Sequence, residues 1–168
     1  MEVRKVGIIA FAFGMLETIL SNQRIAQITL QKVRELNASV YTQLDIAYIL
    51  VPEIVDIQSI RNDEFGPPPT LRIARGAIQW AKRRKITELW IVAAEPHLWR
   101  ALRDVQQAVR EAEEYIEVRI CEEIKQYPRG SWFCLNSAQK RTRSWWNWHK
   151  RELIFKFMPF FIYKRIAG

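Results

Sequence analysis

Several features that would place this chain in a specialised structural class are missing. It has only two cysteines, Cys121 and Cys134, in 168 residues, too few to staple a disulfide scaffold. Hydrophobic residues make up 49% and charged residues 26%, which excludes a disordered or low-complexity chain. The apolar run Val6–Leu16 ends at Glu17 and is too short to span a bilayer. We therefore expect a cytoplasmic protein in which both cysteines are free thiols.

Sequence motifs of well-known catalytic and cofactor sites are also missing. The chain has no G-x-S-x-G elbow, no P-loop and no G-x-G-x-x-G motif. Its two histidines, His97 and His149, and its cysteines lack the C-x-x-C or H-x-x-x-H spacing of zinc ligands. We expect no metal site. Asp63 and Glu64, beside Gly66 and three prolines, are expected to form a solvated turn.

The net charge of +8 is concentrated at the end of the chain. Residues 139–168 contain eight basic residues and a single acidic residue, Glu152, and so carry +7 of the total. The first 138 residues are almost neutral. Any function that depends on positive charge is therefore expected to reside in the C-terminal segment.

Buried strands and amphipathic helices alternate along the chain. Short apolar runs with β-branched and aromatic residues predict strands at Val3–Phe13, Val40–Val51, Glu88–Ala94 and Tyr115–Cys121. Helical spacing predicts helices at Ser21–Leu36, Thr70–Lys85 and Pro96–Ala112, and a last helical segment over Arg143–Tyr163. This alternation is typical of an α/β domain with a mostly parallel sheet covered by helices on both faces. We expect residues 1–138 to form this domain, with residues 139–168 as a basic, aromatic helical segment of the same domain.

A ligand site is expected where the carboxyl ends of the strands meet the N-termini of the helices. Ser21 and Thr70 are predicted helix caps at two such junctions, and Arg24 lies inside the first helix. Glu95 and His97 stand at the third, with Arg100 on the same helix face as His97. Basic groups near helix N-termini oppose the helix dipole, which suggests a compensating anion. Each residue also has a plain structural interpretation: a solvated arginine, a histidine bonded to a loop carbonyl, or a cap.

Residues 70–101 resemble the YdcF-like, SanA and ElyC family of bacterial proteins. The resemblance lies in Thr70-Leu-Arg-Ile-Ala74, in the strand Glu88–Ala94 and in Pro96-His-Leu-Trp-Arg-Ala101. The stretch Ser21–Ala26 is similar to an early helix entry of the family, and Gly14 stands where members usually have a pair of glycines. The resemblance implies a Rossmann-like fold, a link to bacterial envelope metabolism and S-adenosylmethionine as one ligand.

The C-terminal segment combines its positive charge with many aromatic residues. Trp145, Trp146, Trp148, Lys150 and Arg151 head a run that continues to Tyr163. Such a composition suits a membrane interface, and single-stranded nucleic acid is a weaker alternative. The aromatic residues could equally form a helix packed on the sheet or a homo-oligomer interface. Pro159 is expected to kink or end the helix.

Two hypotheses about function follow from these patterns. In the first, the domain binds an anionic or nucleotide-like small molecule through Gly14, Ser21, Arg24, Thr70, Glu95, His97 and Arg100. His97 is then the candidate proton-transfer group, because a histidine pKa is expected near neutrality. In the second, the protein is not an enzyme, and its C-terminal segment docks it peripherally on a membrane or on a partner. The sequence does not decide whether a reaction is catalysed.

Overall fold

The computed structural model describes residues 4–54, 56–61 and 67–167. Its centre is a five-stranded, all-parallel sheet with the strand order β3-β2-β1-β4-β5. In this sheet Ile8 lies opposite Val40 on one side and Trp90 on the other. The strands are β1 (Val6–Ala10), β2 (Ser39–Gln43), β3 (Ile57–Ile60), β4 (Glu88–Val92) and β5 (Glu117–Ile120).

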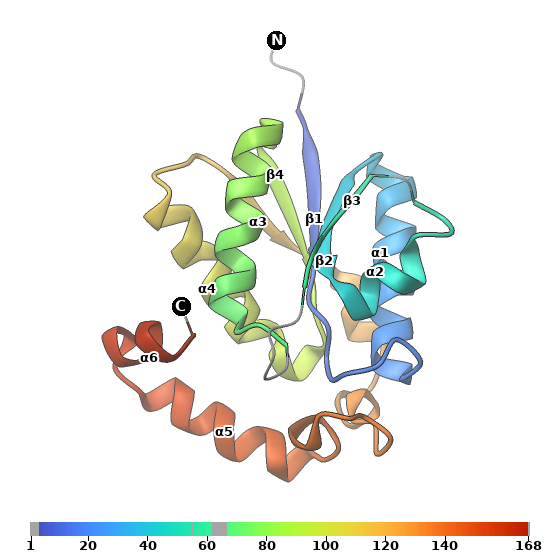
Figure 1. The fold of residues 1–168 in the computed structure, drawn as a ribbon, viewed down its shortest axis with the longest axis vertical. Coiled ribbons are helices and arrows are strands. Elements are labelled where there is room, and N and C mark those ends of the chain that lie inside the picture. Colours follow the sequence, from blue (N-terminus) through green and yellow to red (C-terminus); the bar gives the residue numbers. More distant parts are fainter. Residues whose placement is uncertain (1–3, 55, 62–66, 168) are drawn as a thin grey trace.

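Helices cover both faces of the sheet, as Figure 1 shows, which confirms the predicted three-layer, Rossmann-like α/β fold. Helices α1 and α2 lie on one face and α3 and α4 on the other. The helices are α1 (Leu20–Leu36), α2 (Leu44–Leu50), α3 (Thr70–Arg84), α4 (Leu98–Glu111), α5 (Trp145–Phe157) and α6 (Phe160–Ala167). Short 3₁₀ helices are η1 (Glu95–His97), η2 (Glu122–Gln126), η3 (Arg129–Trp132) and η4 (Lys140–Thr142).

The central strand β1 is apolar along its length because it is buried on both faces. Successive side chains of a strand point to opposite faces. Ile8 and Ala10 accordingly pack with the residues of α1 and α2, whereas Ile9 and Phe11 pack with those of α3 and α4. None of these four side chains is exposed. Val3, the predicted start of this strand, lies outside the described residues.

The prediction of one long strand over Val40–Val51 is wrong. The strand β2 ends at Gln43, and α2 begins at the next residue. Ile46 and Leu50 lie four residues apart and are both buried against α1, the spacing of one helix face. Asp45, expected within a strand, is in the first turn of α2, where its Oδ1 accepts a hydrogen bond from the Leu16 N–H at 2.9 Å.

The edge strand β3 was not predicted from the sequence. Its four residues, Ile57–Ile60, include two polar ones and are only partly buried, so they show neither a continuous apolar run nor a strong alternation. Pairing with β2 defines it, with Val40 opposite Ile57. Because β3 is present, the segment Tyr115–Cys121, predicted as the fourth strand, contains the fifth strand, β5. The expected turn at Asp63 and Glu64 lies outside the described residues.

The C-terminal segment folds back across the end of the sheet where the strands terminate (Figure 1). The predicted helical segment is divided into two helices, α5 and α6, and Pro159 lies between them, which confirms that this proline ends the first helix. Polar contacts attach them to the domain, among them an ion pair between Lys164 of α6 and Glu111 of α4 at 3.0 Å. The Trp148 indole N–H donates to the Pro96 carbonyl at 3.1 Å, Glu152 pairs with Arg100, and the Tyr163 hydroxyl donates to Asp104.

Both cysteines are free, as the sequence predicted, and the structure shows that both are buried. Within the described ranges, none of the helices is long and apolar enough to cross a bilayer.

Candidate functional site

A cavity of about 150 Å³ lies at the carboxyl ends of the central strands. The chain passes from β1 to β2 and β3 on one side, and then to β4 and β5 on the other. The crevice at this reversal of strand order is the usual binding position in such sheets. The described lining residues are Ala12, Phe13, Gly14, Gln43, Pro67, Pro68, Pro69, Thr70, Ile73, His97, Arg100, Gln139, Arg141, Trp148, Arg151, Phe155, Ile166 and Ala167, and none of these is acidic.

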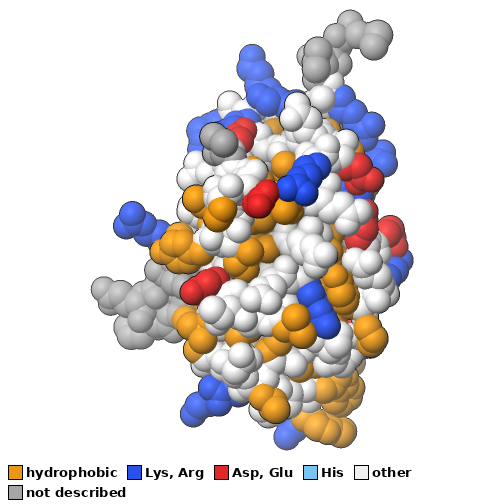
Figure 2. Space-filling model, turned by 90° about the vertical axis from the view of Figure 1, so that its right-hand side faces the viewer, with side chains coloured by type: hydrophobic (Ala, Val, Ile, Leu, Met, Phe, Trp, Pro, Cys, Tyr) orange, Lys and Arg blue, Asp and Glu red, His pale blue; other side chains and the backbone are white. Residues whose placement is uncertain are grey.

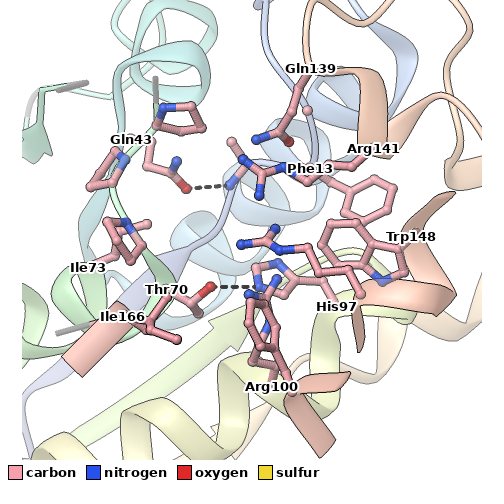
Figure 3. A pocket seen from close by; sticks show the side chains of 18 residues that line it. Phe13, Gln43, Thr70, Ile73, His97, Arg100, Gln139, Arg141, Trp148 and Ile166 are labelled. Atoms are coloured by element: carbon pink, nitrogen blue, oxygen red, sulfur yellow. Dashed lines mark hydrogen bonds between the residues drawn. The ribbon is translucent and has the colours of Figure 1, made fainter. Parts of the chain in front are cut away.

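Thr70 and His97 meet inside the cavity, although 27 residues separate them in the chain (Figure 3). The Thr70 hydroxyl and His97 Nε2 are hydrogen-bonded at 3.2 Å. Thr70 is the first residue of α3, and the cap position is taken by Pro69. The predicted capping role of Thr70 is therefore wrong, and its hydroxyl orients the imidazole instead.

His97 is buried, and its surroundings disfavour the protonated form. Burial away from water lowers the pKa of His97 well below its ordinary value, and the positive charges of Arg100, Arg151 and Arg141 lower it further. The expectation of a pKa near neutrality is wrong for this reason. His97 Nδ1 is buried and has no hydrogen-bond partner within the described part of the chain. At pH 7 the ring is therefore neutral. It can form hydrogen bonds, but it does not carry the additional proton that a general acid would donate.

This environment predicts that acid destabilises the protein through His97. Between the lowered pKa of the folded state and the ordinary value of 6.5, the unfolded chain binds more protons than the folded one. The free energy of unfolding therefore falls as the pH falls through this window, by up to about 1.4 kcal/mol per pH unit. Urea unfolding from pH 7 to 5 measures the slope.

The variant His97→Gln isolates the contribution of this one histidine. Its amide can still bond Thr70 but does not titrate, so the difference in slope between the two proteins reports His97. The carboxyl groups of Asp104 and Glu152 have pKa values raised mainly by burial and act in the opposite direction, but both proteins contain them. Parallel pH profiles would contradict the prediction.

Three arginines from distant parts of the chain surround the cavity. Arg100 comes from α4, Arg141 from η4 and Arg151 from α5. Figure 3 shows the side chains of Arg100 and Arg141 directed towards the space beside His97. Burial lowers the pKa of Arg141, with a further effect of Arg100. Burial and the charges of Arg141 and Arg100 lower the pKa of Arg151 to about 10.

The negative charge near these guanidinium groups comes from Glu152, which is ion-paired with Arg100 and also attracts Arg141 and Arg151. Arg100 and Glu152 are both more than nine-tenths buried and lie 3.1 Å apart. Arg100 also stacks between the rings of Trp148 and Phe155, each 5.3 Å away, and its Nε has no hydrogen-bond partner among the described residues. In the described part of the chain, Arg141 and Arg151 form no ion pair. The site therefore carries an excess of positive charge.

The backbone N–H groups of the loop after β1 are bonded to side chains of the protein itself. Four of its backbone N–H groups donate to other residues: Ala12 to Gln43 at 2.9 Å, Phe13 to Asn22 at 3.0 Å, Met15 to Ser137 at 3.2 Å and Leu16 to Asp45 at 2.9 Å. Phosphate-binding loops leave such groups free for the ligand. This loop is therefore not a backbone cradle for a nucleotide.

Gly14 lines the cavity, but packing explains why this residue is a glycine. Its φ of 103° is in a region that side chains rarely adopt. An added Cβ would also lie 2.6 Å from Ser137 Oγ and 2.8 Å from both Ile19 Cδ1 and Thr142 Oγ1. The absence of a side chain at Gly14 thus allows the η4 segment to pack against the β1–α1 loop.

Three residues predicted for the ligand site have other partners and do not line the cavity. Ser21 lies inside α1, since the cap is Ile19, and its hydroxyl donates to the Phe13 carbonyl at 2.8 Å. Arg24 donates to Ser131 at 2.7 and 2.8 Å and lies over the Tyr127 ring. Glu95 pairs with Arg129 at 2.8 Å. Gly14, Thr70, His97 and Arg100 are brought together.

The residues predicted to contact a membrane or partner divide between two environments. Trp145, Trp146 and Lys150 are exposed. Trp148 is buried, and Arg151 lines the cavity, so a role in surface contact is wrong for Trp148. The buried residues of α5 are Trp148, Glu152 and Phe155, and this i, i+4, i+7 spacing in the sequence was a usable signal of an inward face. Arg141, Gln43 and Gln139 had no comparable signal.

S-adenosylmethionine does not fit this cavity. The volume is below the roughly 300–1,000 Å³ of ordinary small-molecule pockets, and the positive sulfonium of that molecule would face three guanidinium groups. Among the described residues, no group of three metal-ligating side chains is close enough to hold a metal ion.

The fold and the cavity define a Rossmann-like α/β domain with an arginine-rich pocket at its topological switch point. No protein-family model, no curated protein and no solved structure matches the chain. The resemblance of residues 70–101 to the YdcF-like family therefore stays a prediction.

Proposed function

We propose that the protein binds a small anion, of the size of a phosphate or a short carboxylic acid, in the cavity between Thr70, His97 and the three arginines. The observation that carries the proposal is the gathering of Arg100, Arg141 and Arg151 around a small cavity that has no acidic residue in its described lining. Unpaired positive charge in a partly buried position costs free energy. A bound anion removes this cost.

The other groups of the site suit the same ligand. Guanidinium groups donate paired hydrogen bonds to phosphate and carboxylate oxygens. The N-terminus of α3 has no side-chain cap and adds a favourable dipole. Neutral His97 has an unpartnered ring nitrogen that can bond a ligand without adding charge. The small volume and the closed β1–α1 loop favour a compact anion over a nucleotide.

The resemblance to the YdcF-like family is part of this proposal, because His97 and Arg100 carry the resemblance and both line the cavity. A link to envelope metabolism stays a prediction of that resemblance. The geometry supports binding of an anion. Because His97 is neutral at pH 7, any proton transfer by this residue is limited to accepting a proton.

Thermal unfolding in inorganic phosphate, with chloride at matched ionic strength as reference, tests the proposal. At a phosphate concentration of about 100 times the dissociation constant, the folded state gains about 2.7 kcal/mol, or a melting shift of about 5–10 °C at this chain length. Sulfate, pyrophosphate and citrate tested in the same way define the preferred anion.

Arg141→Gln and Arg151→Gln are expected to have two effects of opposite sign. Each raises the phosphate dissociation constant about tenfold to a hundredfold, because hydrogen bonds to charged groups contribute about 1.5–3 kcal/mol. Each also stabilises the anion-free protein by about 0.5–2 kcal/mol, as substitutions that relieve functional strain commonly do. The exposed Arg110 provides the matched control, Arg110→Gln, which changes neither property. An unchanged phosphate response in both pocket variants would sink the proposal.

A further inference from the structure

The outward side of α5 and α6 is apolar, although it faces away from the domain. We call this surface the outer face and define it by Trp146, Lys150, Leu153 and Phe157 of α5 and Phe161 and Arg165 of α6. Trp146 is 68% exposed, Phe157 77% and Phe161 68%. On α5 these residues alternate with the buried stripe of Trp148, Glu152 and Phe155, so the helix is apolar on both sides. Packing within the domain does not explain the outer one.

The charges beside these apolar groups all have one sign. Lys150, Lys156 and Arg165 are exposed on the two helices, and exposed Lys164 pairs with Glu111 of α4 at 3.0 Å. Glu152, the one acidic residue of α5 and α6, is buried against Arg100. Figure 2, turned by 90° from Figure 1, shows hydrophobic and basic side chains but no acidic ones at the lowest end of the molecule, the end where α5 lies. The surface is therefore amphiphilic and cationic.

A groove of about 500 Å³ runs along one flank of α5. Trp99, Trp145, Trp146 and Leu153 supply apolar walls, and Lys150 and Lys156 supply cations to its lining. Arg129 and Glu152 also line it, but each is already ion-paired, with Glu95 and Arg100 respectively. An apolar channel with positive groups at its border is complementary to a molecule that has a hydrocarbon part and an anionic head.

We infer that the outer face docks the protein peripherally on an anionic lipid bilayer. Tryptophan and aliphatic side chains are favourable at the level of the lipid headgroups, and lysines attract anionic lipid. A second copy of the chain is a poor occupant, because a symmetric interface would bring the cations of both copies together without an exposed acidic residue of α5 or α6 to balance them. Since the pocket is lined by the opposite side of α5, docking leaves its residues in place.

Co-sedimentation with vesicles is the test. The full chain is mixed with vesicles of phosphatidylcholine alone, or of phosphatidylcholine and phosphatidylglycerol in equal parts, at low ionic strength. Binding is expected for the anionic vesicles and should weaken as salt is added. Lys150→Gln and Lys156→Gln should each reduce it about fivefold, which corresponds to about 1 kcal/mol.

A double variant separates the apolar contribution. Leu153→Ser with Phe157→Ser should reduce the partition coefficient at least tenfold for each side chain, because each loses its burial in the interface. The matched control is Tyr48→Ser with Leu135→Ser, whose side chains are 63% and 82% exposed elsewhere on the surface, and it should bind as the unchanged protein does. The phosphate-dependent melting shift should be the same in both double variants, so a failure of docking and a failure of the pocket are distinguishable.

Three results would overturn the inference. The first is equal binding to neutral and anionic vesicles. The second is binding that the outer-face double variant leaves unchanged. The third is a dimer in light scattering that the same variant converts to a monomer while neither protein binds vesicles, since this would assign the outer face to a second copy.

Discussion

Trp148→Ala is expected to lower the free energy of unfolding by about 3–5 kcal/mol, as large-to-small changes of buried aromatic residues do. The indole is 3% exposed and contacts Phe13, His97 and Arg100, with ring centroids 4.6 Å apart for Phe13 and 5.5 Å for His97. The substitution leaves a cavity and removes the indole N–H that donates to the Pro96 carbonyl. Urea denaturation followed by circular dichroism measures the loss.

The control for this prediction is two residues away on the same helix. Trp146 is 68% exposed, so Trp146→Ala should change stability by less than about 0.5 kcal/mol. Trp148→Ala should also weaken the phosphate-dependent melting shift, because Trp148 forms one wall of the cavity and holds Arg100. Equal stabilities of the two variants would show that α5 is not attached to the domain as the structure has it.

Glu152→Gln is expected to lower the free energy of unfolding by about 3–5 kcal/mol in anion-free buffer. Removing one partner of a buried ion pair leaves the other charge uncompensated, and here the lost carboxylate also attracts Arg141 and Arg151, so all three arginines lose a counter-charge. Phosphate should recover much of the lost stability, so the melting shift on adding phosphate should be larger than in the unchanged protein. A differential scanning calorimetry series over phosphate concentration measures both effects.

The exposed pair of Arg34 and Glu53 supplies the comparison. Both side chains are more than half exposed and lie 2.9 Å apart, so Glu53→Gln should cost no more than about 1 kcal/mol and should not alter the response to phosphate. A Glu152→Gln protein that is destabilised but no more sensitive to phosphate than the unchanged protein would mean that the carboxylate stabilises the fold without competing for the anion site.

Helix α5 connects the two proposals about this protein. Its inward side supplies Trp148, Arg151 and Phe155 to the cavity, and its outward side carries the groups proposed to meet lipid. The two sides can be changed independently, because residues of the two stripes do not coincide. The variants above therefore separate anion binding from docking within a single helix.

Much of the fold could be predicted because burial leaves a direct trace in the sequence. The strand β4 reads as a continuous apolar run since both of its faces are covered, and the apolar stripes of α3 and α4 recur at helical spacing. The segment Leu44–Leu50 was predicted wrongly because Ile46 and Leu50 suit a strand or a helix equally well. The choice depends on which neighbours the segment meets after β2 ends.

The site was predictable where local chain order fixes it. The junction after β4 must lie at the carboxyl edge of the sheet, and it brings His97 and Arg100 there. The same reasoning misplaced Ser21, Arg24 and Glu95, because being near a helix start does not determine the direction of a side chain.

The sequence by itself therefore determined the layered α/β architecture, the position of the crevice and the concentration of positive charge in residues 139–168. Tertiary structure alone decided that Arg141 and Arg151 turn inward to the cavity while Lys150 turns outward, and that His97 is too buried to be protonated at pH 7. The physical reason is that the pKa and the partners of a side chain depend on what lies across space from it. The closing of the C-terminal helices over the sheet sets those distances.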